Sequence, residues 1–165
     1  MRCASHPCIS SHAMHLPLTQ DDIVPETVAN FLQLCAGSAE TKTGYIGSQV
    51  HRVRPGLGVE FGDFERGDGR GGFAPVAETG PYMAEENLVG RHSEPGVLSF
   101  IPAGVDRVAS VVLITTSPAS HLDGRQVVFG KVLSGLQHVE AMLTVFNAQG
   151  VPTAPIKIAA AGELQ

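Results

Sequence analysis

The chain has 165 residues, which is enough for one domain with a sizeable core. Its formal net charge of −5 argues against a general binder of nucleic acid or of anionic lipid headgroups. No apolar run approaches the ~18 residues of a membrane-spanning helix. The three cysteines, Cys3, Cys8 and Cys35, are an odd number and do not indicate a disulfide framework. We therefore expect an intracellular, reducing compartment, with cytoplasm and mitochondrion both left open.

The first 20 residues contain no acidic residue and several serines. Mitochondrial targeting segments share this composition, but they carry more arginine than the single Arg2 and form an amphipathic helix. Pro7 and Pro17 interrupt any strand here, because proline fits a sheet only at an edge, a strand start or a bulge. We favour a degraded or shortened first strand over a targeting segment.

The same stretch holds five side chains that can bind zinc, namely Cys3, His6, Cys8, His12 and His15. Their spacing matches no standard zinc finger, and the loop between the pairs is too short for a knuckle and helix. We therefore predict no metal site, and nothing in the rest of the sequence predicts a cofactor.

A first helix is expected after Asp21 or Asp22, either of which could cap it, with Pro25 near its first turn and Gly37 as its stop. Apolar residues recur at helical spacing and predict its buried face, namely Val28, Phe31, Leu32 and Cys35.

Two short strands are expected next, over residues 48–54 and 57–61, joined by a turn at Pro55-Gly56. In a regular first strand, Val50, Arg52 and Arg54 would share one face while His51 and Val53 take the other. An arginine on one strand would lie close enough to Glu60 on the other to interact. These residues predict a surface groove with a fixed cation, which could bind a ligand, take part in catalysis, or be a solvated face.

Residues 67–72 are rich in glycine but lack the Lys-Ser/Thr ending of a phosphate-binding loop. Residues 97–101 and 108–116 are β-rich, and the near-continuous hydrophobicity of the second predicts an interior strand. A second amphipathic helix is indicated by Leu136, Val139, Met142 and Leu143. His92 and His138 are expected to be structural or solvated, since neither has a nucleophile or carboxylate in a recognised sequence arrangement.

The sequence resembles the cyclophilins, a family of peptidyl-prolyl cis-trans isomerases. The resemblance rests on several motifs in family order, at residues 25–31, 44–45, 47–48, 51–52, 55–56, 62–64, 69–72, 85–87, 95–99, 122–124, 127–132 and 156–159. It implies a mostly β fold, an antiparallel β-barrel with two α-helices covering its ends. Because family members begin with two well-formed strands, we interpret residues 1–15 as an atypical N-terminal segment and residues 16–165 as the cyclophilin-like domain.

The resemblance also implies roles for individual residues. Arg52 stands where the family places the arginine that donates to the prolyl nitrogen. The family's proline-pocket Phe and Met are replaced by Leu57 and Gly58, and the Gln that steadies the arginine is Glu60. The full set of positions that correspond to the substrate groove is Leu57, Gly58, Glu60, Phe61, Ile101, Pro102, Ala103, Val111, Leu113, His121, Leu122 and Gln126.

Most of these positions differ from the family pattern. Val111 and Leu113 stand in the segment where the family has Gln-Phe-Phe, His121 replaces a Trp, and Gln126 replaces a His. We therefore expect a protein-binding or structural module, a subunit of a larger assembly, with weak or absent isomerase activity. Its partner would be a protein or a proline-containing peptide segment. The alternative is an active isomerase of specialised preference. Phe61, Ile101, Val111 and Val112, if exposed, would form an apolar patch for a protein partner.

Overall fold

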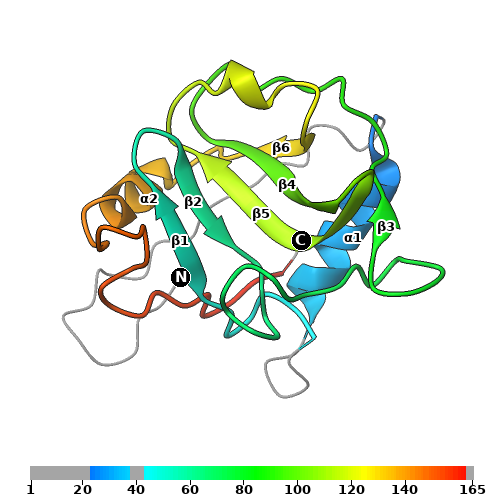
Figure 1. The fold of residues 1–165 in the computed structure, drawn as a ribbon, viewed down its shortest axis with the longest axis horizontal. Helices are drawn as coiled ribbons and strands as arrows, with labels where there is room; N and C mark the ends of the chain where they lie inside the picture. The colour runs from blue at the N-terminus through cyan, green and yellow to red at the C-terminus, as the bar shows by residue number, and fades with distance from the viewer. Residues whose placement is uncertain (1–22, 38–42, 163–165) are drawn as a thin grey trace.

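In the computed structural model, residues 23–37 and 43–162 are described, and they form one mostly β body (Figure 1). The strands are β1 (Val50–Arg54), β2 (Gly58–Phe61), β3 (Met83–Ala84), β4 (Val97–Gly104), β5 (Arg107–Thr115) and β6 (Val127–Lys131). The helices are α1 (Pro25–Ala36), α2 (Leu136–Met142) and the short 3₁₀ helix η1 (Ser120–Leu122). The predicted fold class is confirmed.

The sheet is antiparallel with the strand order β1-β2-β5-β4-β6, and β3 adds to β5. The last motif segment, residues 156–159, lies beside the start of β1. The Gly47 and Val50 amides donate to the carbonyls of Ile158 and Ile156, and the Ile158 amide donates back to Ser48. Its pairing is limited to an isolated bridge between Gln49 and Lys157, so it is shorter than a regular strand. The expected first strand lies outside the described residues.

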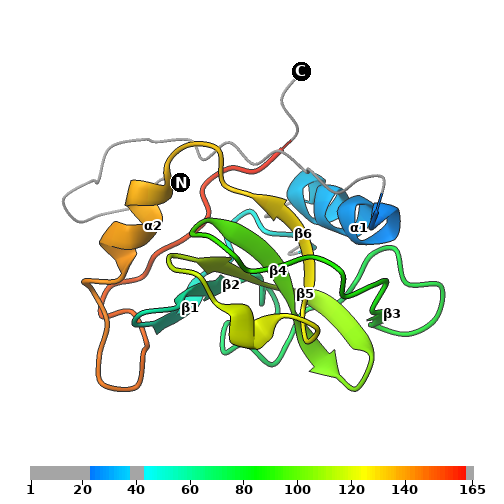
Figure 2. The ribbon, with the colours of Figure 1, turned by 90° about the horizontal axis from the view of Figure 1, so that it is seen from above.

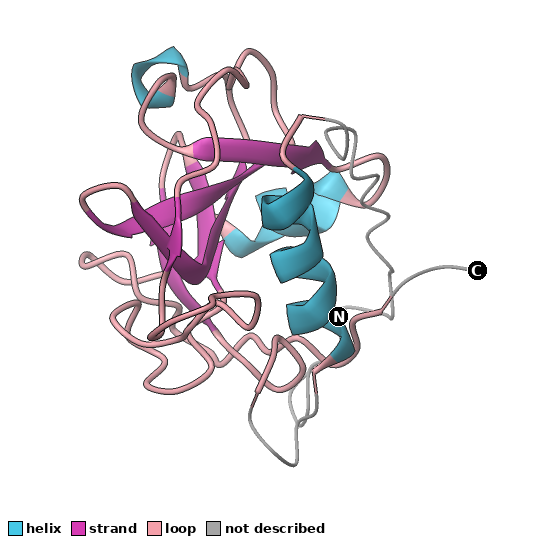
Figure 3. Ribbon diagram, turned by 90° about the vertical axis from the view of Figure 1, so that its right-hand side faces the viewer, coloured by secondary structure: helices cyan, strands magenta, loops and turns pink. Residues whose placement is uncertain are grey.

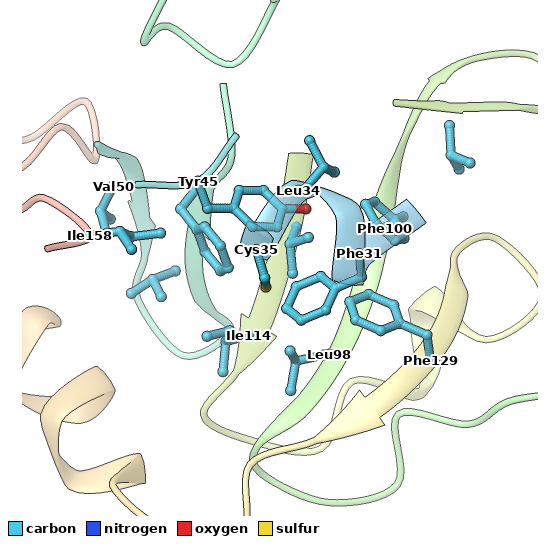
Figure 4. Close-up of a cluster of buried hydrophobic side chains, with 14 of the residues drawn as sticks. Phe31, Leu34, Cys35, Tyr45, Val50, Leu98, Phe100, Ile114, Phe129 and Ile158 are labelled. Carbon is cyan, nitrogen blue, oxygen red and sulfur yellow. The ribbon is translucent and has the colours of Figure 1, made fainter. Parts of the chain in front are cut away.

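The two helices lie at opposite ends of the molecule, with the C-terminal segment running between them (Figure 2). Helix α1 lies along one side of the sheet (Figure 3). Aromatic rings join it to β6 and to the loop before β1, because the Phe31 ring centroid lies 4.9 Å from that of Phe129 and 5.4 Å from that of Tyr45. Figure 4 shows these rings gathered with Cys35 in the core. The predicted buried faces of both helices are confirmed, although Leu32, Leu136 and Leu143 are only partly buried.

The start of α1 differs from the prediction. The N-cap residue is Val24, whose side chain makes no capping hydrogen bond. The Glu86 carboxylate accepts from the backbone amides of Glu26 and Thr27 instead, at 3.2 and 2.8 Å. The helix begins at Pro25, and a residue 60 positions away supplies an acceptor for its first amides. Asp21 and Asp22, which were predicted to cap it, lie outside the described residues.

Candidate functional site

A β-bulge in β1 decides where the site arginines point. Val50 pairs with Phe61, but the next pair joins Arg52 to Glu60, so His51 is an extra residue without a partner on β2. Such a bulge re-aims the side chains that follow it. Val50 and Val53 are consequently both in the core, whereas Arg52 is exposed on the outer face. The prediction that Val50 shares a face with Arg52 was wrong, since it assumed regular alternation.

Glu60 pairs with Arg54 rather than with Arg52. The Arg54 Nε atom donates to Glu60 Oε1 in a short ion pair, and the Nε2 atom of His51 lies 3.8 Å from Glu60 Oε2. Burial by itself would raise the pKa of Glu60. The His51 ring and the Arg54 guanidinium outweigh it and hold the pKa of this carboxyl below its ordinary value. Among the described residues, Arg52 has no ion-pair partner.

A row of directly paired residues crosses four strands on the outer face of the sheet. Arg52 pairs with Glu60, Glu60 with Leu113, and Leu113 with Ser99. Direct partners in an antiparallel sheet place their side chains on the same face. Leu113 is outside the main core cluster, yet only 1% of its surface is exposed. The outer face therefore has a covered centre, with an accessible arginine at its β1 end.

The other residues predicted for the proline pocket differ in how far they are exposed to solvent. Leu57 is half-buried in the β1–β2 turn, where its carbonyl accepts from the Thr116 amide at 2.8 Å. Gly58 is buried, and a Cβ atom there would lie 2.0 Å from the carbonyl oxygen of Ile114. On η1, His121 is exposed and Leu122 is half-buried.

Four predicted groove residues come together in one hollow, whose lining does not include Arg52. The hollow has a volume of about 300 Å³. Its lining includes Ile101, Pro102, Ala103 and Val111, together with Gly69, Arg70, Gly71, Tyr82 and Ala109. Sequence reasoning missed Tyr82 and Ala109, because neither stands in a motif and only the folded chain brings them beside β4. A further hollow of about 240 Å³, between residues 46–49 and 63–67, contains no predicted site residue.

The glycine-rich loop at residues 67–72 lines part of the hollow of about 300 Å³, and one carboxylate organises this loop. Asp63 accepts from the backbone amides of residues 66 and 68–71, at distances between 2.8 and 3.1 Å. Burial opposes its ionisation, but these amides outweigh it and hold the pKa of Asp63 far below its usual range. A Cβ atom at Gly69 would lie 2.7 Å from His51 Nε2, so the loop covers the bulge closely.

The expected apolar patch is not present on the surface. Phe61 and Val112 belong to the core, with 5% and 0% of their surface exposed, and Val111 is also buried. Of the four residues, only Ile101 is partly accessible. The prediction failed because β2 and β5 are interior strands, and a sequence run of apolar residues does not reveal what covers each face.

His92 has the carboxylate and hydroxyl neighbours that its sequence context did not reveal. Its Nδ1 atom lies 3.1 Å from Asp123 Oδ1, and its Nε2 atom lies 2.9 Å from Ser99 Oγ. The order Asp-His-Ser is that of a hydrolytic triad. However, His92 and Ser99 have no exposed surface, so no substrate reaches this hydroxyl in the folded chain. The interpretation of His92 as structural is consistent with this burial.

Within the described ranges, no group of three or more His, Cys, Asp or Glu side chains is arranged to hold a metal ion. The N-terminal cysteines and histidines considered for zinc lie outside those ranges. Neither α1 nor any other described helix is both long and apolar enough to cross a membrane.

Comparison with known proteins finds both a family profile and individual relatives that match the chain. The sequence profile described as "Cyclophilin type peptidyl-prolyl cis-trans isomerase/CLD" matches residues 14–163. Peptidyl-prolyl cis-trans isomerase D of Eremothecium gossypii is 41% identical over 150 residues, which cover 87% of this chain. The chain spans only 40% of the length of that relative.

Proposed function

Because the chain belongs to the cyclophilin-type peptidyl-prolyl cis-trans isomerase family, we propose that it binds proline-containing peptide segments on the outer face of its sheet and isomerises them only weakly. The observation that carries this proposal is the contrast between an exposed Arg52 and a buried pocket floor at Gly58 and Leu113. The cation for the chemistry is available, whereas the surface that would grip a proline ring is reduced.

Arg52 would act without any covalent step. The X–Pro bond resists rotation by roughly 18–20 kcal/mol because the nitrogen shares its lone pair with the carbonyl group. A guanidinium that donates to the prolyl nitrogen holds this lone pair away from the carbonyl and stabilises the twisted state. The bulge at His51 supports this role, since it turns Arg52 to the outer face and away from the core valines.

The replacements in the pocket would lower the rate. Leu57 and Leu113 replace rings whose stacking is worth about 0.5–1.5 kcal/mol each beyond area burial. Gly58 replaces a methionine, and the loss of a buried apolar side chain forfeits about 1.5–3 kcal/mol of contact. Since each 1.36 kcal/mol is a factor of ten in rate, these losses together amount to about a hundred-fold or more.

One observation favours the alternative, an isomerase of ordinary activity. The Glu60 carboxylate makes its ion pair with Arg54 rather than with Arg52, although Arg52 also contributes to lowering the pKa of Glu60. Because Arg54 shares this carboxylate, Glu60 would offset the charge of Arg52 less than a direct ion pair would. The size of the pocket, rather than the charge of Arg52, would then limit the rate. A role as a subunit of a larger assembly also remains part of the proposal.

The test is the exchange between cis and trans forms of an acetylated, amidated Ala-Ala-Pro-Ala peptide, followed by NMR. We expect chemical-shift changes that show binding, a small acceleration of exchange, and its loss in Arg52→Ala. Arg66→Ala is the matched control, because the Arg66 side chain is 61% exposed and its one ion pair within the described residues is with Asp68 at 3.6 Å. Strong acceleration that depends on Arg52 would support the alternative, and a complete lack of binding would contradict both.

A further inference from the structure

A second arginine lies on the outer face of β1, beside the one proposed for catalysis. After the bulge, the pairing of β1 with β2 is regular, and Arg52 lies opposite Glu60 while Arg54 lies opposite Gly58. Residues two apart in a regular strand point to the same face. The burial pattern agrees with this, because Val53 is in the core while Arg52 and Arg54 are both exposed. The outer face therefore carries two cations at neighbouring positions of one strand.

The carboxylate between the two arginines is hidden from a ligand. Only 6% of the Glu60 side chain is exposed, against 46% of the Arg54 side chain. The β1–β2 turn and the segments hydrogen-bonded beside it, residues 115–118 and 147–151, contain no Asp or Glu. A ligand at this edge therefore meets positive charge, although the whole chain has a formal net charge of −5.

Arg54 has hydrogen-bond donors left for a ligand. A guanidinium has five N–H donors, and the contact with Glu60 is made through the one on Nε. Among the described residues, Glu60 is the sole side chain that accepts from Arg54, and nearly half of the arginine side chain is open to solvent. The guanidinium can therefore donate to a second anionic group while it keeps the first.

Arg54 also flanks the positions predicted for the proline pocket. Its partner across the strands is Gly58, and its carbonyl accepts from the Leu57 amide at 3.0 Å. Side chains two residues apart in an extended strand are separated by about 6.6 Å, and the same spacing applies to an extended peptide. A bound segment whose proline faces Arg52 therefore brings a residue within two positions of that proline close to Arg54.

We infer that Arg54 is a specificity-determining residue, which selects proline-containing segments with an anionic side chain within two residues of the proline. This inference rests on the proposed function and names the class of segment that the site prefers. The planar guanidinium matches the carboxylate of Asp or Glu and the phosphate of phosphoserine alike, so negative charge is the shared chemistry.

The experiment compares acidic and neutral versions of one peptide. The host is acetylated, amidated Ala-Ala-Ala-Pro-Ala-Ala-Ala, with Glu or Gln placed in turn at each of the four positions within two residues of the proline. NMR titration at neutral pH measures the affinities. For at least one position, we expect the Glu peptide to bind about fivefold more tightly than the Gln peptide. In about 0.5 M NaCl this preference should fall below about twofold, because salt screens exposed charges.

Phosphoserine at the preferred position distinguishes the two sources of negative charge. It carries more charge than Glu and should bind about tenfold or more tightly than the Gln peptide. A preference for phosphoserine without one for Glu would identify the anion as a phosphate and would still support the inference.

The double variant Arg54→Gln/Glu60→Gln isolates the contribution of Arg54. It removes one positive and one negative charge, so the net charge of the chain and Arg52 are both retained. We expect its preference for Glu over Gln to fall below about twofold. Lys131→Gln is the matched control, because the Lys131 side chain is 41% exposed, pairs with Glu94 at 2.6 Å, and belongs to the strand at the other end of the sheet order. The control should keep the full preference.

Three results would overturn the inference. An undiminished preference in the double variant would assign it to another cation, such as Arg52. Equal binding of the Glu, Gln and phosphoserine peptides by the wild type would refute the inference alone, since the peptide site itself would remain. A lack of binding by every peptide would refute the proposed function and the inference with it. The wild-type comparison needs no variant, so it decides the matter even where a substitution disturbs the fold.

Discussion

Replacing Gly58 by alanine should destabilise the protein more than the addition of one methyl group usually does, because the backbone of β5 occupies the space of the added atom. A Cβ atom at Gly58 would lie 2.0 Å from the carbonyl oxygen of Ile114 and 2.9 Å from the carbonyl carbon. Both are backbone atoms of a paired strand, so β2 and β5 would have to separate locally. Overpacking of this kind costs about 1–3 kcal/mol. Urea unfolding followed by circular dichroism measures the change.

Gly104→Ala is the control that isolates this clash. Gly104 has φ +153° against +158° at Gly58, but nothing lies within 4 Å of its added Cβ atom. Both variants carry the same backbone penalty, so their difference reports the contact with Ile114. We expect Gly58→Ala to be less stable than Gly104→Ala by about 1–3 kcal/mol, or by roughly 2–4 °C in Tm per kcal/mol. Equal stabilities would refute the reasoning.

Three further predictions concern the scaffold around the site. Asp63→Asn should lower the free energy of unfolding at pH 7 by about 2 kcal/mol, because the glycine-rich loop loses its charged acceptor. Since folding lowers the pKa of Asp63, its stabilisation is complete above the ordinary carboxyl pKa of about 4 and is lost as the pH falls toward the folded value. The difference between the two proteins in urea titrations should therefore shrink below pH 4, and a constant difference would contradict this. Glu86→Gln should cost about 1 kcal/mol by weakening the acceptor at the start of α1, whereas the exposed Glu78→Gln should cost nothing measurable in the same assay. Burial raises the pKa of the Cys35 thiol to about 12, so iodoacetamide at pH 8 should label it only after unfolding. Peptide mapping checks this, and equal labelling in native and urea-treated protein would show it to be wrong.

The exposure of Arg52 and the burial of Gly58 and Leu113 have different structural origins. The outward direction of the Arg52 side chain depends on the bulge at His51, which involves only β1 and β2. The pocket floor depends on how β2 packs against β5 at Gly58 and Leu113. A change in one of these features need not alter the other, and the proposed function accordingly separates binding from rate.

The sequence by itself determined the local elements of this protein. Periodic apolar residues specified both helices, and Pro55-Gly56 specified the turn between β1 and β2, because such signals act within a few residues. Its motifs also indicated the fold and the position of Arg52.

Only the tertiary structure decided which side chains meet. The bulge that turns Arg52 outward, the pairing of Glu60 with Arg54, and the burial of Phe61 and Val112 all depend on strand register. The contacts of His92 with Asp123 and Ser99 join residues up to 31 positions apart in the sequence. Contacts of this kind follow from the packing of whole elements, and no periodicity within one segment contains them.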